Sequence, residues 1–319
     1  THLPTIFNKK VRTNNAYDFN IEIKDSKFIR HLLKKDYYID SPILIKGNAN
    51  DEENRIEINI DNDKMTYEGI KYENINIACT NTNEICEASA DITRIDNEGK
   101  TNFTLYADAQ EDTLSTKTSW RTEGKFDKKG IPNNSNGTIN AQILFSDSTG
   151  NTNTYVNLNR SEIVMRDTIW YIHPSRITIF NNKYKFNNVG ISHENQHIIA
   201  NGTISDIPED SLLVDIKEIP VEYLQGVANF HAVKFGGRLS GKAKLSNLNS
   251  SVPQIEANVN IDNMLLNGGR MGDADLHITW DQEVDGISIK GLIEDEENIW
   301  TRVSGFISPS QNDILLVLN

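Results

Sequence analysis

Apolar and polar residues alternate along most of this chain with a period of two. Ile56, Ile58 and Ile60 alternate with acidic and amide residues, and residues 255–261 repeat the pattern. A strand turns successive side chains to opposite faces, so the alternation predicts strands with one apolar and one polar face. We expect further strands of this kind at 103–107, 139–145, 239–245, 274–280 and 287–291, with turn clusters at 133–137 and 267–269.

Two segments, 25–35 and 220–227, favour a helix. The first begins with an Asp and the second with Pro220, and both are common helix starts. Each is short and follows a predicted strand, so we expect both to plug or cover an edge of the sheet at a repeat junction. The predicted fold class is all-β with two short helices.

The chain also repeats itself. A strand pattern ending in Lys24 precedes the first helical segment, and a similar one ending in Lys217 precedes the second, an offset of 217 − 24 = 193 residues. Duplicated blocks that bury a face against their neighbours make elongated architectures. We predict one continuous β-groove over residues 1–319, with repeat blocks at about 19–146 and 212–319 and a connecting β-region at 147–211.

A third partial copy bears on the end of the sequence. Residues 199–205 and 212–214 return as 302–308 and 314–318, which puts Asn319 at the position of Lys217. This predicts that the chain is a piece of a longer repetitive protein. The turn-rich stretch 147–153 is a weak candidate for a boundary.

About twenty antiparallel strands at a spacing of ~4.8 Å would extend on the order of 90 Å, and accumulated twist would make such a sheet curl. Its apolar face either lines an open, U-shaped groove or packs on a second sheet. Alternation alone favours the second sheet, whereas the repetition and the lack of an obvious partner sheet favour the groove. The expected lining is Ile56, Ile58, Ile60, Ile75, Ile77, Val259, Ile261, Leu276, Ile278, Trp280, Ile287 and Ile289.

The net charge argues against nucleic acid as a partner. The 45 acidic and 32 basic residues give a net charge of −13, which repels nucleic-acid phosphates, so we expect no nucleic acid partner.

The sequence contains no apolar run of about 18 residues and no export signal at Thr1. We therefore expect any membrane anchor outside this segment.

The two cysteines flank a turn-like stretch. Cys79 and Cys86 lie on either side of residues 80–84 and between apolar-rich runs, so they could face one another across a hairpin. A disulfide in an oxidising compartment and a pair of small buried thiols are both consistent with this spacing.

No motif predicts an enzyme. His193 and His197 with the residues between them match the H-E-x-x-H pattern of zinc proteases, which needs a helix to place both His on one face. The flanking residues 190–192 and 198–202 have a β pattern with glycines, so we interpret the motif as a polar hairpin turn. Nucleophile-elbow and phosphate-loop patterns are missing as well. We predict no catalytic residue, no metal and no cofactor.

The C-terminal half resembles a known family. The segments DTIWYIHPS (167–175), QHIIANG (196–202), FGGRLSG (235–241) and GDADL (272–276), in this order, are similar to the repeats of the translocation and assembly module protein TamB, within the wider AsmA-like group. The resemblance covers roughly residues 160–319, and the first half follows through the internal repeat.

This resemblance implies a periplasmic, inner-membrane-anchored protein that spans the envelope of a diderm bacterium through a β-taco, a long U-shaped β-groove with an apolar interior. It implies that phospholipid acyl chains are the ligand, moved between the two membranes, and that an outer-membrane barrel assembly protein is a partner. The anchoring helix and the barrel-contacting domain of the family lie outside this chain, so neither attachment carries over.

Two hypotheses for function result. The first is a hydrophobic groove that shields lipid; transfer of an acyl chain of ~16 carbons at about 0.8 kcal/mol per CH₂ requires on the order of 10 kcal/mol of apolar contact. The second is a surface adhesin or glycan-binding β-solenoid, suggested by Asn- and Thr-rich polar positions, which would bind through exposed aromatic residues and loops.

Overall fold

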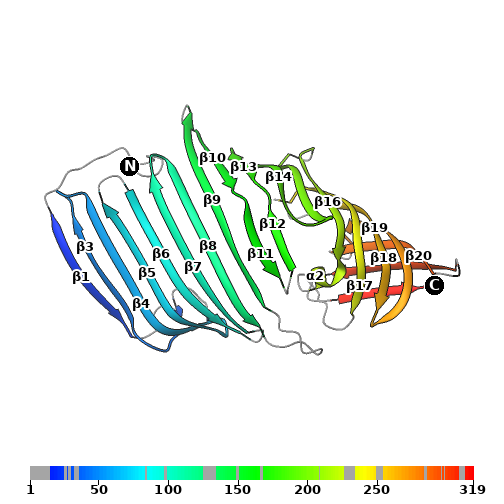
Figure 1. The fold of residues 1–319 in the computed structure, drawn as a ribbon, viewed down its shortest axis with the longest axis horizontal. Coiled ribbons are helices and arrows are strands. Elements are labelled where there is room, and N and C mark those ends of the chain that lie inside the picture. Colours follow the sequence, from blue (N-terminus) through cyan, green and yellow to red (C-terminus); the bar gives the residue numbers. More distant parts are fainter. Residues whose placement is uncertain are drawn as a thin grey trace. The chain divides into compact units, whose positions relative to one another are not determined.

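The computed structural model divides the chain into two compact units, unit 1 (Thr1–Pro174) and unit 2 (Ser175–Asn319). It describes residues 15–24, 27, 30–31, 36–82, 85–96, 99–124, 134–148, 151–165, 168–207, 209–225, 234–248, 254–283, 286–295, 297, 299–308 and 313–319. Within these residues almost all regular structure is β, so the predicted all-β class is confirmed. Unit 1 contains β1 to β12 and unit 2 contains β13 to β22, and most of these strands are labelled in Figure 1.

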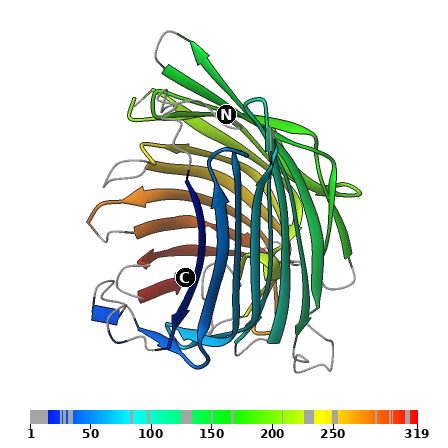
Figure 2. The same cartoon turned by 90° about the vertical axis from the view of Figure 1, so that its left-hand side faces the viewer.

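The strands of unit 1 are long. They are β1 (Ala16–Ile23), β2 (Tyr37–Ile39), β3 (Ile43–Asn50), β4 (Arg55–Tyr67), β5 (Ile70–Thr82), β6 (Ile85–Ile95), β7 (Gly99–Gln110), β8 (Thr113–Gly124), β9 (Ser135–Ser148), β10 (Asn151–Leu158), β11 (Ser161–Met165) and β12 (Thr168–Ile172). Figure 2 shows that β3 to β9 lie side by side and bend along their length.

Unit 2 contains the remaining strands and one described helix. They are β13 (Ser175–Phe180), β14 (Lys183–His193), β15 (Gln196–Ile204), β16 (Ser211–Pro220), α2 (Val221–Gln225), β17 (Phe235–Ser246), β18 (Gln254–Leu266), β19 (Gly269–Asp281), β20 (Gly286–Glu294), β21 (Trp300–Ser308) and β22 (Asp313–Leu318). All seven stretches predicted as strands lie within strands of one unit or the other.

The strand pairings whose register is described are antiparallel, and most join strands consecutive in sequence. In unit 1, β10 and β11 follow one another along the same edge of β9, β12 pairs with β11, and β2 pairs with β4 beyond the end of β3. In unit 2 the order runs from β13 to β22 without a crossover. The sheet is therefore a series of hairpins, as the alternating runs and turns predict.

The pairing register reproduces the internal repeat. Residues directly opposite one another across four strands are Ile21, Ile45, Ile60 and Ile77 in unit 1, and Val214, Ala243, Ala257 and Ile278 in unit 2. Ile21 and Val214 are the first members of the two sets. They are 193 residues apart in sequence, which is the offset between Lys24 and Lys217. The duplicated sequence thus folds into the same sequence of strand pairs.

Other predictions need correction. Residues 135–137, expected in a turn, belong to β9, whereas 267–268 do form the turn between β18 and β19. The candidate boundary 147–153 falls at the β9–β10 hairpin, and the chain instead divides into its two units after Pro174. Most of the predicted helix 25–35 lies outside the described residues. A single continuous groove over both units stays a prediction.

The helix α2 differs from its expected role as an edge cover. It connects β16 and β17, which are interior strands of unit 2, and Val221 packs against a buried cluster on the apolar side of the sheet. The buried members of this cluster are Leu239, Ala257, Val259, Ile261, Met264, Ala274, Ile293 and Val303. The helix therefore contributes to the core of unit 2.

Candidate functional site

One face of unit 1 is apolar across eight strands. Residues directly opposite in neighbouring strands point to the same face of a sheet. The register aligns a row that we call the inner row: Ile21, Ile45, Ile60, Ile77, Ala90, Leu105, Thr118 and Ile139. Thr118 is the one polar member.

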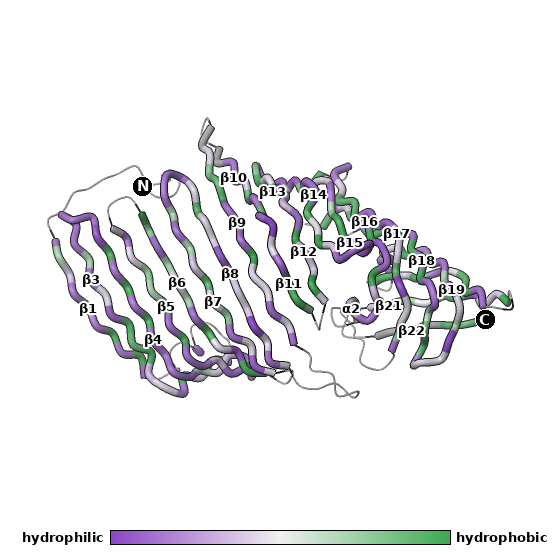
Figure 3. Tube along the Cα trace, in the orientation of Figure 1, coloured by the Kyte–Doolittle hydropathy of each residue, from purple (hydrophilic) through white to green (hydrophobic). Residues whose placement is uncertain are grey.

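The opposite face of the same strands is polar. Each residue of the inner row has a sequence neighbour that points to the opposite face. The register aligns these neighbours in a row that we call the outer row: Asn20, Lys46, Asn59, Ala78, Ser89, Tyr106, Lys117 and Asn140. The resulting alternation of apolar and polar positions along the strands is visible in Figure 3. Unit 1 is therefore a two-faced sheet with a sharp contrast between its faces.

The apolar face of unit 1 is only partly covered. Ile21 is 48% exposed, Ile56 is 46% exposed, and Phe103 and Leu105 are 36% and 37% exposed. Within unit 1 the main contacts of each described strand are with the strands that it pairs with. A sandwich core would bury these side chains, and apolar patches that stay open on a folded protein usually mark binding sites.

Two aromatic side chains on this face lie over glycines of the neighbouring strand. Trp120 is opposite Gly137, and a Cβ added to Gly137 would come within 2.6 Å of the indole ring. Phe19 is opposite Gly47, where an added Cβ would clash with the Phe19 ring. Because glycine has no side chain, each ring can lie flat against the backbone of the neighbouring strand. The aromatic rings therefore protrude little from the apolar face.

Unit 2 has the corresponding face but buries much of it. Its register aligns Val189, Ala200, Val214, Ala243, Ala257, Ile278 and Ile289. Val259 and Ile261, on the same face of β18, are 5% and 7% exposed, and α2 packs against their cluster. The apolar face of unit 1 thus has several large side chains that are at least 36% exposed, although Ile75 is only 8% exposed, whereas part of the same face in unit 2 forms a buried core.

The register locates every side chain predicted to line a groove. Ile56, Ile58, Ile60, Ile75 and Ile77 share the apolar face of unit 1, and Val259, Ile261, Leu276, Ile278, Trp280, Ile287 and Ile289 share that of unit 2. Their role as a lining stays a prediction. Sequence reasoning missed the open centre of unit 1, which includes Phe103, Leu105, Trp120 and Ile139, although it identified two of the three strands concerned.

Cys79 and Cys86 are diagonal neighbours on this apolar face. Cys79 is opposite Ala88 and Cys86 is opposite Asn81, on adjacent strands. Both are free, half-buried thiols in the structure. Burial raises the pKa of the Cys86 thiol, and the neighbouring Cys79 raises it further. The disulfide and the pair of packed thiols both stay predictions.

The H-E-x-x-H segment forms the tip of the β14–β15 hairpin, as predicted. His193 is opposite Gln196 and His197 is opposite Ser192, so the two imidazoles belong to opposite faces of the sheet. His197 Nε2 instead lies 3.2 Å from Asp215 Oδ2. Within the described residues no group of three or more His, Cys, Asp or Glu could hold a metal ion.

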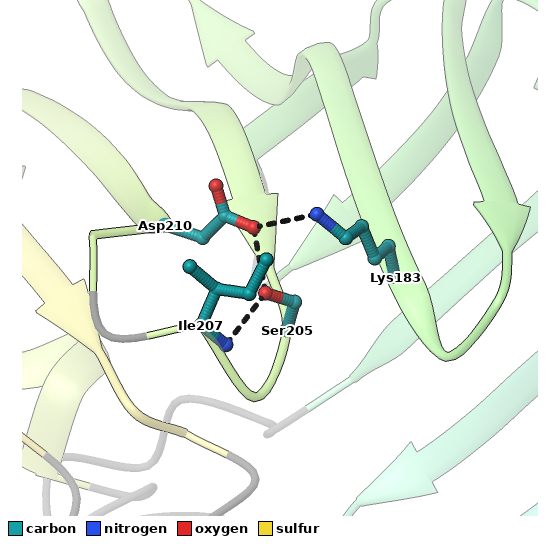
Figure 4. Close-up of polar contacts among 4 residues, drawn as sticks. All are labelled: Lys183, Ser205, Ile207 and Asp210. Carbon is teal, nitrogen blue, oxygen red and sulfur yellow. Dashed lines mark hydrogen bonds and ion pairs between the residues drawn. The ribbon is translucent and has the colours of Figure 1, made fainter.

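A polar cluster supports the loops at one end of β14, β15 and β16 (Figure 4). Ser205 Oγ donates to Asp210 Oδ2 at 2.6 Å and accepts from the Ile207 N–H at 3.0 Å, while Lys183 Nζ lies 3.4 Å from the same carboxylate oxygen. The Ser205 hydrogen bond lowers the pKa of Asp210, with a further contribution from Lys183. Both the proton and the oxygen of this hydroxyl are engaged in holding the turn.

Two shallow depressions lie over the polar face of unit 2, with volumes of about 420 and 270 Å³. The larger is bordered by Leu213 and by Asp215, Lys242, Lys244 and Glu256. Neither has a Phe, Tyr or Trp side chain in its lining. The glycan-binding hypothesis depends on exposed aromatic residues, so these depressions do not favour it.

Among the residues that the structure describes, no helix has the length and apolar character required to cross a membrane. Comparison of the chain with known proteins finds no matching family model, no similar curated protein and no similar solved structure.

Proposed function

We propose that the apolar face of unit 1 shields lipid acyl chains from water. The observation that carries the proposal is the partly exposed apolar face, on which Phe103 and Leu105 of β7 are 36% and 37% exposed although β7 is paired along both of its edges. A soluble protein gains by burying such a surface, and a flexible hydrocarbon chain fits a flat, side-chain-lined face without needing polar partners.

The size of the face suits this ligand. Seven strand spacings of ~4.8 Å make the inner row on the order of 30 Å long, similar to the hydrocarbon thickness of a bilayer. Transfer of an acyl chain out of a membrane costs on the order of 10 kcal/mol. Contact between the chain and the apolar face removes apolar surface from water, and at about 25 cal/mol per Å² this contact offsets part of that cost.

The resemblance to TamB supports a periplasmic location for this activity. In that setting the chain is a periplasmic segment of an inner-membrane-anchored protein, and the ligands are phospholipids on their way to the outer membrane. The same setting includes support of outer-membrane assembly through a barrel partner that contacts regions outside this chain. These assignments rest on the resemblance and on the open face together.

The test is photo-crosslinking with a phospholipid that carries a diazirine at the end of one acyl chain, combined with native mass spectrometry of lipid co-purified from cells. We expect bound phospholipid and crosslinks on inner-row residues such as Leu105 of β7 and Ile139 of β9, assigned to single residues by fragmentation of the crosslinked peptides. Crosslinks confined to outer-row residues such as Tyr106, or a lipid-free protein that binds glycans, would refute the proposal and favour the adhesin hypothesis.

A further inference from the structure

The apolar face of unit 1 is polar at one end of its strands. Four residues from the inner row along β6, β7, β8 and β9, the register aligns a row that we call the polar row: Arg94, Thr101, Thr122 and Ser135. Because four is an even number, these side chains point to the same face as the inner row, at about 13 Å from it. Four residues in the other direction, the same strands carry Cys86, Ala109, Leu114 and Ile143. The face therefore has a polar end and an apolar end.

Arg94 has donors to spare at the polar end. Its Nη2 lies 2.8 Å from Oδ2 of Asp96, and its side chain is 40% exposed. Among the residues that the structure describes, Asp96 is the one acceptor of this guanidinium, and the buried Nε has none. The residues directly opposite Arg94 are Tyr72 and Thr101, which are uncharged. A guanidinium has five N–H groups in a planar fork, so Arg94 can bind a second anion beside Asp96.

The three hydroxyls of the polar row also leave a donor over. Ser135 Oγ donates to Thr122 Oγ1 at 3.2 Å, and a second hydrogen bond of 3.0 Å joins the hydroxyls of Thr122 and Thr101. Three hydroxyls carry three protons, and these two bonds use two of them. The last proton, on Thr101 or Thr122, has no acceptor within the described part of the chain. The guanidinium and this hydroxyl would both be satisfied by a ligand that carries several acceptor oxygens.

We propose that the polar row binds the phosphate group of a phospholipid whose acyl chains lie on the inner row. An anionic phosphodiester accepts hydrogen bonds at more than one oxygen, which suits a guanidinium and a hydroxyl on neighbouring strands. The site depends on the lipid-shielding function proposed above, because it needs acyl chains on the apolar face. It gives the bound lipid a direction, with the headgroup beside Arg94 and the chains toward the apolar end.

The test compares two ligands that share one fluorescent acyl chain, phosphatidylglycerol and diacylglycerol, by equilibrium binding to the full chain. We expect the wild type to bind both and to prefer phosphatidylglycerol by about 10-fold or more, because hydrogen bonds to a charged group are strong. Arg94→Gln should remove this preference and leave diacylglycerol binding unchanged. Glycerol phosphate, which has the phosphate without the acyl chains, should compete only weakly.

Two further variants separate the role of Arg94 from general effects of charge and folding. Arg121→Gln is the matched control, because Arg121 lies on β8 next to Thr122 but is exposed on the outer face, opposite Asn102 and Asn136. It should keep the preference for phosphatidylglycerol. Asp96→Asn removes the competing carboxylate and keeps an oxygen to accept the Gly99 N–H. It should bind phosphatidylglycerol more tightly than the wild type does.

The outcomes distinguish the headgroup site from the lipid-shielding face. A folded wild type that binds neither lipid would overturn both proposals. Equal binding of the two lipids by the wild type, or equal losses in Arg94→Gln and Arg121→Gln, would overturn the headgroup site alone. Glycerol phosphate that binds as tightly as phosphatidylglycerol would overturn it too, because the polar row would then be a site for a free phosphate. Circular dichroism establishes that each variant is folded.

Discussion

Leu105→Asp in the inner row of unit 1 tests the lipid-shielding face most directly. Leu105 lies at the centre of β7, opposite Ala90 and Thr118, and is 37% exposed. Full burial of a leucine contributes about 1.5–3 kcal/mol, so loss of its partly buried surface should lower the free energy of unfolding by about 1–2 kcal/mol. A net stability of about 5–15 kcal/mol tolerates this loss.

The effect on lipid should be much larger. In the lipid-free protein the new carboxylate can reach water from its exposed position, but an acyl chain lying on the inner row would cover it. Removing an unpaired charge from water costs several kcal/mol even after relaxation, and each 1.4 kcal/mol is a factor of ten. We expect phospholipid binding to weaken by about 100-fold or more.

The assay is retention of a phospholipid with a fluorescent acyl chain, measured for folded wild type and variants. Tyr106→Asp is the matched control, because Tyr106 is the next residue of β7, is 55% exposed and lies in the outer row. It should bind as the wild type does. Equal loss in both variants, or normal binding by a folded Leu105→Asp protein, would refute the assignment of the face.

Three further predictions concern the packing and titration of unit 1 and unit 2. Gly137→Val should push the Trp120 ring off the sheet and lower the free energy of unfolding in urea by about 1–3 kcal/mol; an unchanged midpoint would contradict the close contact. Because the Ser205 hydrogen bond lowers the pKa of Asp210, its contribution to stability should be present above the unfolded pKa of about 3.9 and lost as the pH falls through the lower folded value. Acid titrations of wild type and Asp210→Asn should then differ in that window, and identical profiles would argue against it. Burial raises the pKa of Cys86, so alkylation at neutral pH, followed by peptide mass spectrometry, should be slower than for an exposed thiol.

Sequence reasoning succeeded where the pattern depends on a single strand. The alternation around Ile58 and Val259 gave strands and faces, because a side-chain period of two determines the face once one residue is placed. The internal repeat indicated that the strand pairs from β1 to β5 in unit 1 correspond to those from β16 to β19 in unit 2. The turn at Glu194 followed from the β pattern on either side of it.

What it missed depends on neighbours that the sequence does not reveal. Alternation cannot tell an open face from a buried one, so Ile56 and Val259 looked equivalent, yet one is 46% exposed and the other 5% exposed. The difference comes from packing within unit 2, including Val221 of α2. Phe103 was predicted in a strand, but only the register puts it opposite Trp120 on the open face.

The order of strand pairing has a consequence for how the chain acquires its structure. Most strands pair with the strand that precedes them, so contacts are short in sequence and each hairpin can form soon after its residues become available. Growth by hairpins also means that every incomplete form ends in an unpaired strand beside an uncovered apolar face. The nascent chain is then most prone to aggregation at its growing edge, and a holding chaperone that binds extended apolar strands would act there.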